Sequence, residues 1–276
     1  MRKSLLSLAV LSALSIPTAV FAEEAAAPAA AAPAPAYTIS YNVGLYSQYV
    51  FRGLTQTSEK PSLQGGVDFT HASGFYLGTW ASNISWLEDA ATASAGGNTS
   101  GYRNSSLELD VYGGYRNTIG ATGLGYDFSV LQYIYPGSNN LPAVSANTTE
   151  LAAALSYKWL QGKFSYIASK NGLGNADARG TYYAELNANY PIGETGITVN
   201  AHVGRQKFDG GVADFNDITY SYTDWKIGAT KSFANGVNVG GYYTDTNGSD
   251  AGYGSAIYAG GDIAKSTFTA FVQKTF

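Results

Sequence analysis

The stretch that decides the fold closes the chain and reads Thr267-Phe268-Thr269-Ala270-Phe271-Val272-Gln273-Lys274-Thr275-Phe276. In an extended strand, successive side chains point to opposite faces. The mostly apolar face consists of Phe268, Ala270, Val272, Lys274 and Phe276, and the other face consists of Thr267, Thr269, Phe271, Gln273 and Thr275. A last strand with this alternation and a terminal aromatic residue is typical of an outer-membrane β-barrel.

The same period of two recurs along the chain. It begins with Tyr37, Ile39, Tyr41, Val43 and Leu45, which are separated by small or polar residues. Strands are predicted near 37–45, 62–70, 74–83, 105–116, 123–135, 148–159, 162–170, 180–191, 196–206, 218–231, 236–245 and 265–276. We therefore predict an all-β fold, a transmembrane antiparallel up-and-down β-barrel of about twelve strands.

The connections between these strands alternate in length. Short ones are expected at 71–74, 160–162 and 234–236, and long ones at 87–104, 136–147, 208–217 and 246–264. Outer-membrane barrels have short periplasmic turns and longer extracellular loops. The long connections are rich in Gly, Asn, Ser and Asp, so we expect them to be mobile and exposed to water.

The N-terminus predicts export. Arg2 and Lys3 precede an apolar run that is too short to span a bilayer, and Ala22 ends a small-residue cleavage pattern. Residues 1–22 are therefore expected to be a signal peptide, and residues 23–36, rich in Ala and Pro, a periplasmic linker. The barrel would occupy residues 37–276 of a protein located in the bacterial outer membrane.

Composition agrees with this class and excludes others. Charged residues make up only 13% of the chain, Gly and Tyr number 33 and 22, and mean hydropathy is −0.10. These values suit strands with one lipid-facing and one polar face, whereas a soluble β-sandwich would carry charged outer faces. Without Arg2 and Lys3 the chain has 14 basic and 20 acidic residues, a net charge of −6, which argues against nucleic acid as a partner. There is no Cys, so thiol chemistry is excluded.

Several local strings carry a family resemblance. They are Tyr49-Val50-Phe51-Arg52-Gly53-Leu54, Gly74-Phe75-Tyr76-Leu77-Gly78-Thr79-Trp80-Ala81-Ser82-Asn83, Tyr133-Ile134-Tyr135-Pro136, Tyr222-Thr223-Asp224-Trp225-Lys226-Ile227-Gly228 and Thr244-Asp245-Thr246. In these strings the chain resembles the TorF family of porins, also called the Gcw_chp family of proteobacterial proteins. The resemblance implies an outer-membrane barrel with channel activity, and it carries over no catalytic residue. The stretch from Leu87 to Asn104 is longer and richer in Gly and Ser than the family leads us to expect.

A charge on the lipid face costs about 2–4 kcal/mol at mid-bilayer, so charged residues on the polar faces are expected to line the lumen. The predicted pore-lining residues are Arg52, Asp68, Glu108, Asp110, Arg116, Asp127, Glu150, Lys158, Glu185, His202, Asp224 and Lys226. Seven of them are acidic and four are basic, which slightly favours cations. Two arrangements stay open: acids and bases on separate walls of a water-filled lumen, or pairs that plug a narrow one.

Arg52 is the foremost candidate because Gly53 follows it, and a backbone bend there would let a long cation reach across the bore. The alternative is an arginine that snorkels or pairs with a loop. Asp224 and Lys226 place opposite charges on one face, either as channel groups or as a solvated pair.

An enzyme is not indicated. The chain has two histidines, and neither His71, at a predicted turn, nor His202, in a predicted strand, belongs to a nucleophile motif. Its Gly pairs open no helix, so they predict no phosphate loop, and no cofactor or metal is implied.

The sequence thus predicts a channel for passive diffusion of small hydrophilic solutes or ions. The alternative is a plugged structural barrel, or an adhesive or receptor barrel that works through its loops. The expected partners are outer-membrane lipid, lipopolysaccharide, and the barrel assembly machinery, which would read Phe276 as its signal.

Overall fold

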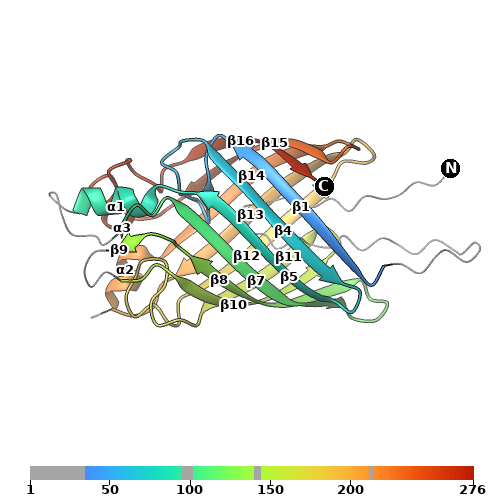
Figure 1. Ribbon diagram of the computed structural model, residues 1–276, viewed down its shortest axis with the longest axis horizontal. Coiled ribbons are helices and arrows are strands. Elements are labelled where there is room, and N and C mark those ends of the chain that lie inside the picture. Colours follow the sequence, from blue (N-terminus) through green and yellow to red (C-terminus); the bar gives the residue numbers. More distant parts are fainter. Residues whose placement is uncertain (1–34, 95–101, 140–143, 212–213) are drawn as a thin grey trace, which may run out of the picture.

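Twelve strands close into one antiparallel barrel in the computed structural model, which describes residues 35–94, 102–139, 144–211 and 214–276. Closure comes from β1, which pairs with β4 on one side and with β16 on the other. Figure 1 shows the strongly tilted strands of this barrel and the helices gathered at one end. The predicted signal peptide and all of the predicted linker except residues 35 and 36 lie outside the described residues.

The barrel strands are β1 (Tyr37–Tyr46), β4 (Ser62–His71), β5 (Phe75–Asn83), β7 (Leu107–Thr118), β8 (Leu124–Ile134), β10 (Thr148–Tyr157), β11 (Leu160–Ile167), β12 (Tyr182–Pro191), β13 (Ile197–Lys207), β14 (Tyr222–Ser232), β15 (Val237–Thr246) and β16 (Thr267–Thr275). The connections contain β2 (Val50–Phe51), β3 (Leu54–Thr55), α1 (Trp86–Ser94), β6 (Tyr102–Arg103), β9 (Ser138–Asn139), α2 (Phe215–Tyr220) and α3 (Asp250–Tyr253). In the described part of the chain, no helix is long and apolar enough to cross a membrane.

Each predicted strand overlaps one barrel strand, so the predicted all-β barrel is confirmed. Two boundaries were wrong. The turn expected at 160–162 is formed by Lys158 and Trp159, because the pairing of Tyr157 with Leu160 leaves two residues for a tight hairpin turn. The start predicted for the tenth strand falls in α2.

The side chains are distributed in the opposite way to a soluble protein. Along β5, Phe75 and Leu77 are exposed on the outside, whereas Tyr76, Trp80 and Ser82 point inward and are buried. Large apolar residues are exposed around the whole outer surface, and many Thr, Gln, Asp and Glu side chains are buried inside it. This pattern fits a wall that faces lipid on the outside and is polar on the inside.

Short turns join the strands at one end of the barrel, here called the turn end, and long connections join them at the other, the loop end. Contrary to the expectation of exposed loops, the described parts of the long connections place many side chains inside the loop end, where they form a mainly aromatic core with residues of the strands. Its members are Tyr49, Leu54, Trp80, Ile84, Trp86, Leu87, Tyr102, Leu131, Tyr133, Tyr135, Ala146, Phe208, Tyr222, Tyr253, Tyr258, Ile263 and Ala264. About 25 cal/mol is gained for each Å² of apolar surface buried, which explains why these segments turn inward.

Candidate functional site in the lumen

The connection between β1 and β4 carries a short hairpin, β2–β3, whose tip is Arg52-Gly53. Both tip residues have positive φ, 47° and 80°, as a tight hairpin turn requires. In the barrel order, β12 lies six places from β4, on the opposite wall. The tip reaches that side, because a Cβ atom on Gly53 would lie only 2.6 Å from Cβ of Asp224 in β14.

Arg52 fixes the tip to β10 and β13. Its two terminal nitrogens donate to the two carboxylate oxygens of Glu150 at 2.9 and 2.8 Å, and one of them also donates to Oε1 of Gln206 at 2.9 Å. The guanidinium lies 4.3 Å from the ring centre of Tyr183 and 4.7 Å from that of Phe51. The side chains of Arg52 and Glu150 are only 7% and 3% exposed. The planar fork of arginine suits this two-pronged contact, and a lysine could not reproduce it.

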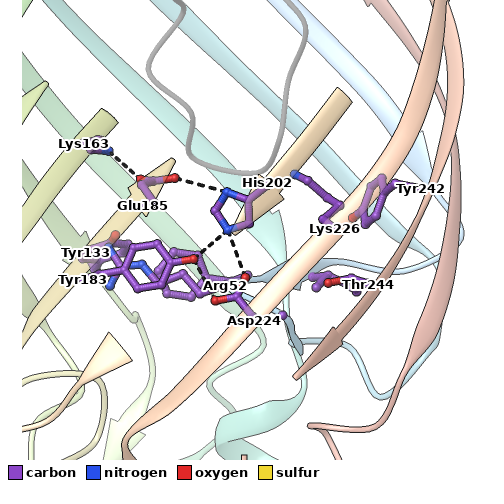
Figure 2. A pocket seen from close by; sticks show the side chains of 13 residues that line it. Arg52, Tyr133, Lys163, Tyr183, Glu185, His202, Asp224, Lys226, Tyr242 and Thr244 are labelled. Carbon is purple, nitrogen blue, oxygen red and sulfur yellow. Dashed lines mark hydrogen bonds and ion pairs between the residues drawn. The ribbon is translucent and has the colours of Figure 1, made fainter. Parts of the chain in front are cut away.

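His202 is the centre of a second group, shown in Figure 2. Its Nε2 lies 3.0 Å from Oδ2 of Asp224 and 2.8 Å from the Tyr183 hydroxyl, which itself donates to Asp224 at 2.8 Å. On the other side of the ring, Nδ1 lies 2.7 Å from Oδ1 of Asn187 and 3.6 Å from Glu185. None of these partners is a Ser, Cys or Thr nucleophile, and the arrangement holds the imidazole in a fixed orientation.

A polar cavity of about 50 Å³ separates the hairpin tip from the β11–β15 wall and has room for a few water molecules. It is lined by Val50, Phe51, Arg52, Gly53, Tyr133, Lys163, Tyr183, Glu185, His202, Asp224, Lys226, Tyr242 and Thr244. The lining thus combines charged groups with aromatic walls, which suits the passage or binding of a small polar solute.

Carboxylates concentrate on the opposite wall. Glu108 accepts a 2.7 Å hydrogen bond from Tyr49, and neither oxygen of its neighbour Asp110 has a hydrogen-bond partner within the described ranges, although both residues are buried. Asp68 and Asp127, nearer the turn end, accept hydrogen bonds from Tyr112 at 2.6 Å and Tyr76 at 2.8 Å.

Arg116 is the basic residue on that wall. Its guanidinium lies 4.6 Å from the ring centre of Tyr76, and one terminal nitrogen donates to Thr70 at 3.1 Å. Together with Glu150, which is paired with Arg52, the β4–β10 wall carries five of the seven predicted luminal carboxylates.

The structure brings eleven of the twelve predicted pore-lining residues into the barrel interior and not Lys158, which lies exposed in the turn after β10. That prediction was wrong because the strand was extended past its turn. Arg52 is luminal and lies at the tip of the β2–β3 hairpin. Whether these side chains line a conducting pore stays a prediction.

Sequence reasoning missed Lys163 and Tyr183. Lys163 lies within the strand predicted at 162–170, and the outward Phe164 and Tyr166 signal its inward parity. Tyr183 was missed because tyrosine fits either face of a barrel strand. Within the described ranges, no group of three or more His, Asp or Glu residues is arranged to hold a metal ion.

Loop contacts hold the hairpin segment from outside the lumen. Oε2 of Glu59 lies 2.8 Å from Nζ of Lys265, and Thr267 donates to Oε1 of Glu59 at 3.2 Å. The hydrogen bond from Lys265 lowers the pKa of the Glu59 carboxyl below its usual value. This ion pair joins the first long connection to the last one.

The fold is a closed antiparallel β-barrel of twelve strands, and a short hairpin folds inward to the luminal cluster. The chain belongs to the Gcw_chp family, described as bacterial protein of unknown function, whose profile matches residues 30–276. This confirms the resemblance to the Gcw_chp family, and the TorF assignment stays a prediction. No curated protein sequence matches the chain significantly.

Solved structures of outer-membrane channels are similar in fold. The NanC porin superposes with a TM-score of 0.52 at 11% identity, covering 87% of this chain and 99% of that one. The KdgM porin gives 0.49 at 8% identity, covering 86% and 98%. The COG4313 outer membrane channel from Pseudomonas putida F1 gives 0.45 at 17% identity, covering 89% and 97%. At these identities the likeness concerns the fold alone.

Proposed function

We propose that this protein is an outer-membrane channel that lets small hydrophilic solutes or ions diffuse through a lumen narrowed by the β2–β3 hairpin. The observation that carries the proposal is the polar cavity between the Arg52 tip and the β11–β15 wall. A barrel that was only structural could fill this space with apolar side chains, as it does at the loop end. Passive diffusion needs no cofactor or energy source.

In this proposal the loop end faces the cell exterior and the turn end faces the periplasm, as in outer-membrane barrels generally. Lipid and lipopolysaccharide would surround the apolar outer face. The barrel assembly machinery would recognise the last strand through Phe276, whose side chain is 69% exposed on the outside.

The second candidate is a closed barrel that acts as a receptor or adhesin through its loops. The aromatic core at the loop end favours it, because that core occupies the mouth through which a solute would enter. In that case the Arg52–Glu150 pair would hold the β2–β3 hairpin in place inside the closed barrel.

Single-channel recording of the refolded protein in planar bilayers tests the proposal. The wild type should show discrete conductance steps, and Arg52→Ala should change their size, because the hairpin loses its anchor on Glu150. Arg179→Ala is the matched control, since Arg179 is exposed in a loop and its Nε donates only to the Ala168 carbonyl. A correctly folded wild-type barrel without conductance would overturn the proposal in favour of the closed receptor.

A further inference from the structure

Lys226 differs from the other cations of the cavity in having no ionic partner. Its ammonium group faces the ring of Tyr242, 5.1 Å from the ring centre, and forms no hydrogen bond or ion pair with any described residue. Figure 2 shows its Nζ directed into the cavity beside His202. A cation left in this position attracts an anion from solution.

The other charges of the cavity are paired. Arg52 is held by Glu150 at 2.8 Å, and Nζ of Lys163 lies 4.0 Å from Glu185. These pairs leave Asp224 as the one remaining carboxylate of the lining.

Asp224 is two residues from Lys226 on the same face of β14, so the sequence pattern offered the two as a pair. The structure separates them. The Asp224 carboxylate turns to the Tyr183 hydroxyl at 2.8 Å and to Nε2 of His202 at 3.0 Å. With its oxygens engaged there, Asp224 does not neutralise Lys226 by direct contact.

We propose that Lys226 is the main contact of a binding site for small monovalent anions, either an inorganic ion or a carboxylate, in the cavity beside the hairpin tip. The site lies beside the hairpin that narrows the lumen. Its role in permeation rests on the proposed function. Counting acidic residues predicted a slight preference for cations, but in this cavity neither Glu185 nor Asp224 forms an ion pair with Lys226 among the described residues.

Chloride NMR line broadening tests binding directly on the refolded full-length barrel, without requiring conductance. The wild type should broaden the chloride line, and added acetate should reverse the broadening if both ions share the site. Lys226→Met should lose most of the excess width, and Lys226→Arg should keep it. Lys170→Met is the matched control, because Lys170 is 77% exposed in a loop and pairs there with Asp177. Equal broadening by the wild type and Lys226→Met would overturn the site, as would loss of broadening in Lys170→Met to the same extent.

Ion selectivity of the same variants, from reversal potentials in a salt gradient, separates this inference from the proposed function. Lys226→Met should lower the chloride-to-potassium permeability ratio about threefold, the factor that one charge ~7 Å from the ion gives in water. Lys226-dependent broadening without any conductance would overturn the channel and leave the anion site standing. Conductance with neither binding nor selectivity dependent on Lys226 would overturn the anion site alone.

Discussion

Arg52 and Glu150, 98 residues apart in the chain, form a two-pronged ion pair inside the barrel, with nitrogen–oxygen distances of 2.9 and 2.8 Å. One partner comes from the hairpin between β1 and β4, and the other from β10, which lies four places from β4 in the barrel, so the pair joins the hairpin to a distant strand. It anchors the tip of the hairpin inside the barrel.

Removing one member of this pair should be more harmful than removing both. Arg52→Ala leaves the buried carboxylate of Glu150 unpaired and should lower the free energy of unfolding by about 3–5 kcal/mol. The double variant with Glu150→Ala should recover much of that loss. Urea unfolding in phospholipid measures all variants of the cycle, and strictly additive losses would show that the two side chains are not coupled.

The tip of the hairpin should not tolerate a side chain at Gly53. Gly53→Ala forces an L-residue to keep φ at 80° and places its Cβ 2.6 Å from Cβ of Asp224. Gly120→Ala is a control for the backbone alone, since φ there is 51° and no atom lies within 4 Å. We expect about 1–2 kcal/mol for the strain in each and a clearly larger loss in Gly53→Ala. Equal losses in the two variants would mean that the tip has room to move away from Asp224.

Acid should loosen the contact between the first and last long connections. The Lys265 hydrogen bond lowers the pKa of Glu59 in the folded protein. The carboxylate therefore stabilises the fold fully above its unfolded-state pKa of about 4.3, and this contribution is lost as pH falls through the lower folded value. A spin label at Lys60→Cys, the only thiol in the chain, should become more mobile in that range.

Glu59→Gln is the comparison for this experiment. The same label should be more mobile in Glu59→Gln than in the wild type at neutral pH, and the two should become alike in acid. A difference that persists unchanged at low pH would assign the effect to something other than the Glu59 carboxylate.

A lysine placed on the outer face of the barrel wall should lower the free energy of unfolding more than a lysine placed on the inner face. Leu186 is 51% exposed on the outside of β12, so Leu186→Lys should cost about 2–4 kcal/mol in a lipid bilayer. Ala154 faces the lumen on β10, opposite Asp127 and Lys163 in the neighbouring strands, so Ala154→Lys should cost much less. Comparable unfolding free energies for the two variants would contradict a lipid-facing outer surface.

Deletion of Phe276 tests the proposed assembly signal. The residue also pairs with the first strand, because its N–H donates to the Tyr41 carbonyl at 2.9 Å. We expect less protein in the outer membrane of producing cells. Phe276→Tyr, which keeps an aromatic end and the backbone contact, should assemble normally. Normal membrane levels of the deletion variant would show that the machinery reads another feature.

Strand parity explains why most of the site could be predicted. Residues such as Glu150 and His202 lie on faces whose neighbours are small or polar, and a charge on the lipid side would be costly, so alternation alone places them inside. The same reasoning failed at Lys158 because nothing in Tyr157-Lys158-Trp159-Leu160 marks a turn by Gly, Asn or Pro.

The sequence by itself determined the closed barrel, its strand order and the inward direction of most of its charges, because the period of two, the lipid outside and the short turns leave little alternative. Only the tertiary structure decided that the hairpin with Arg52 folds into the lumen, that Asp224 turns to His202 and that Lys226 forms no ion pair with any residue that the structure describes. These features depend on contacts between residues far apart in the chain, such as Arg52 and Glu150, and no local pattern encodes which charges will meet across the bore.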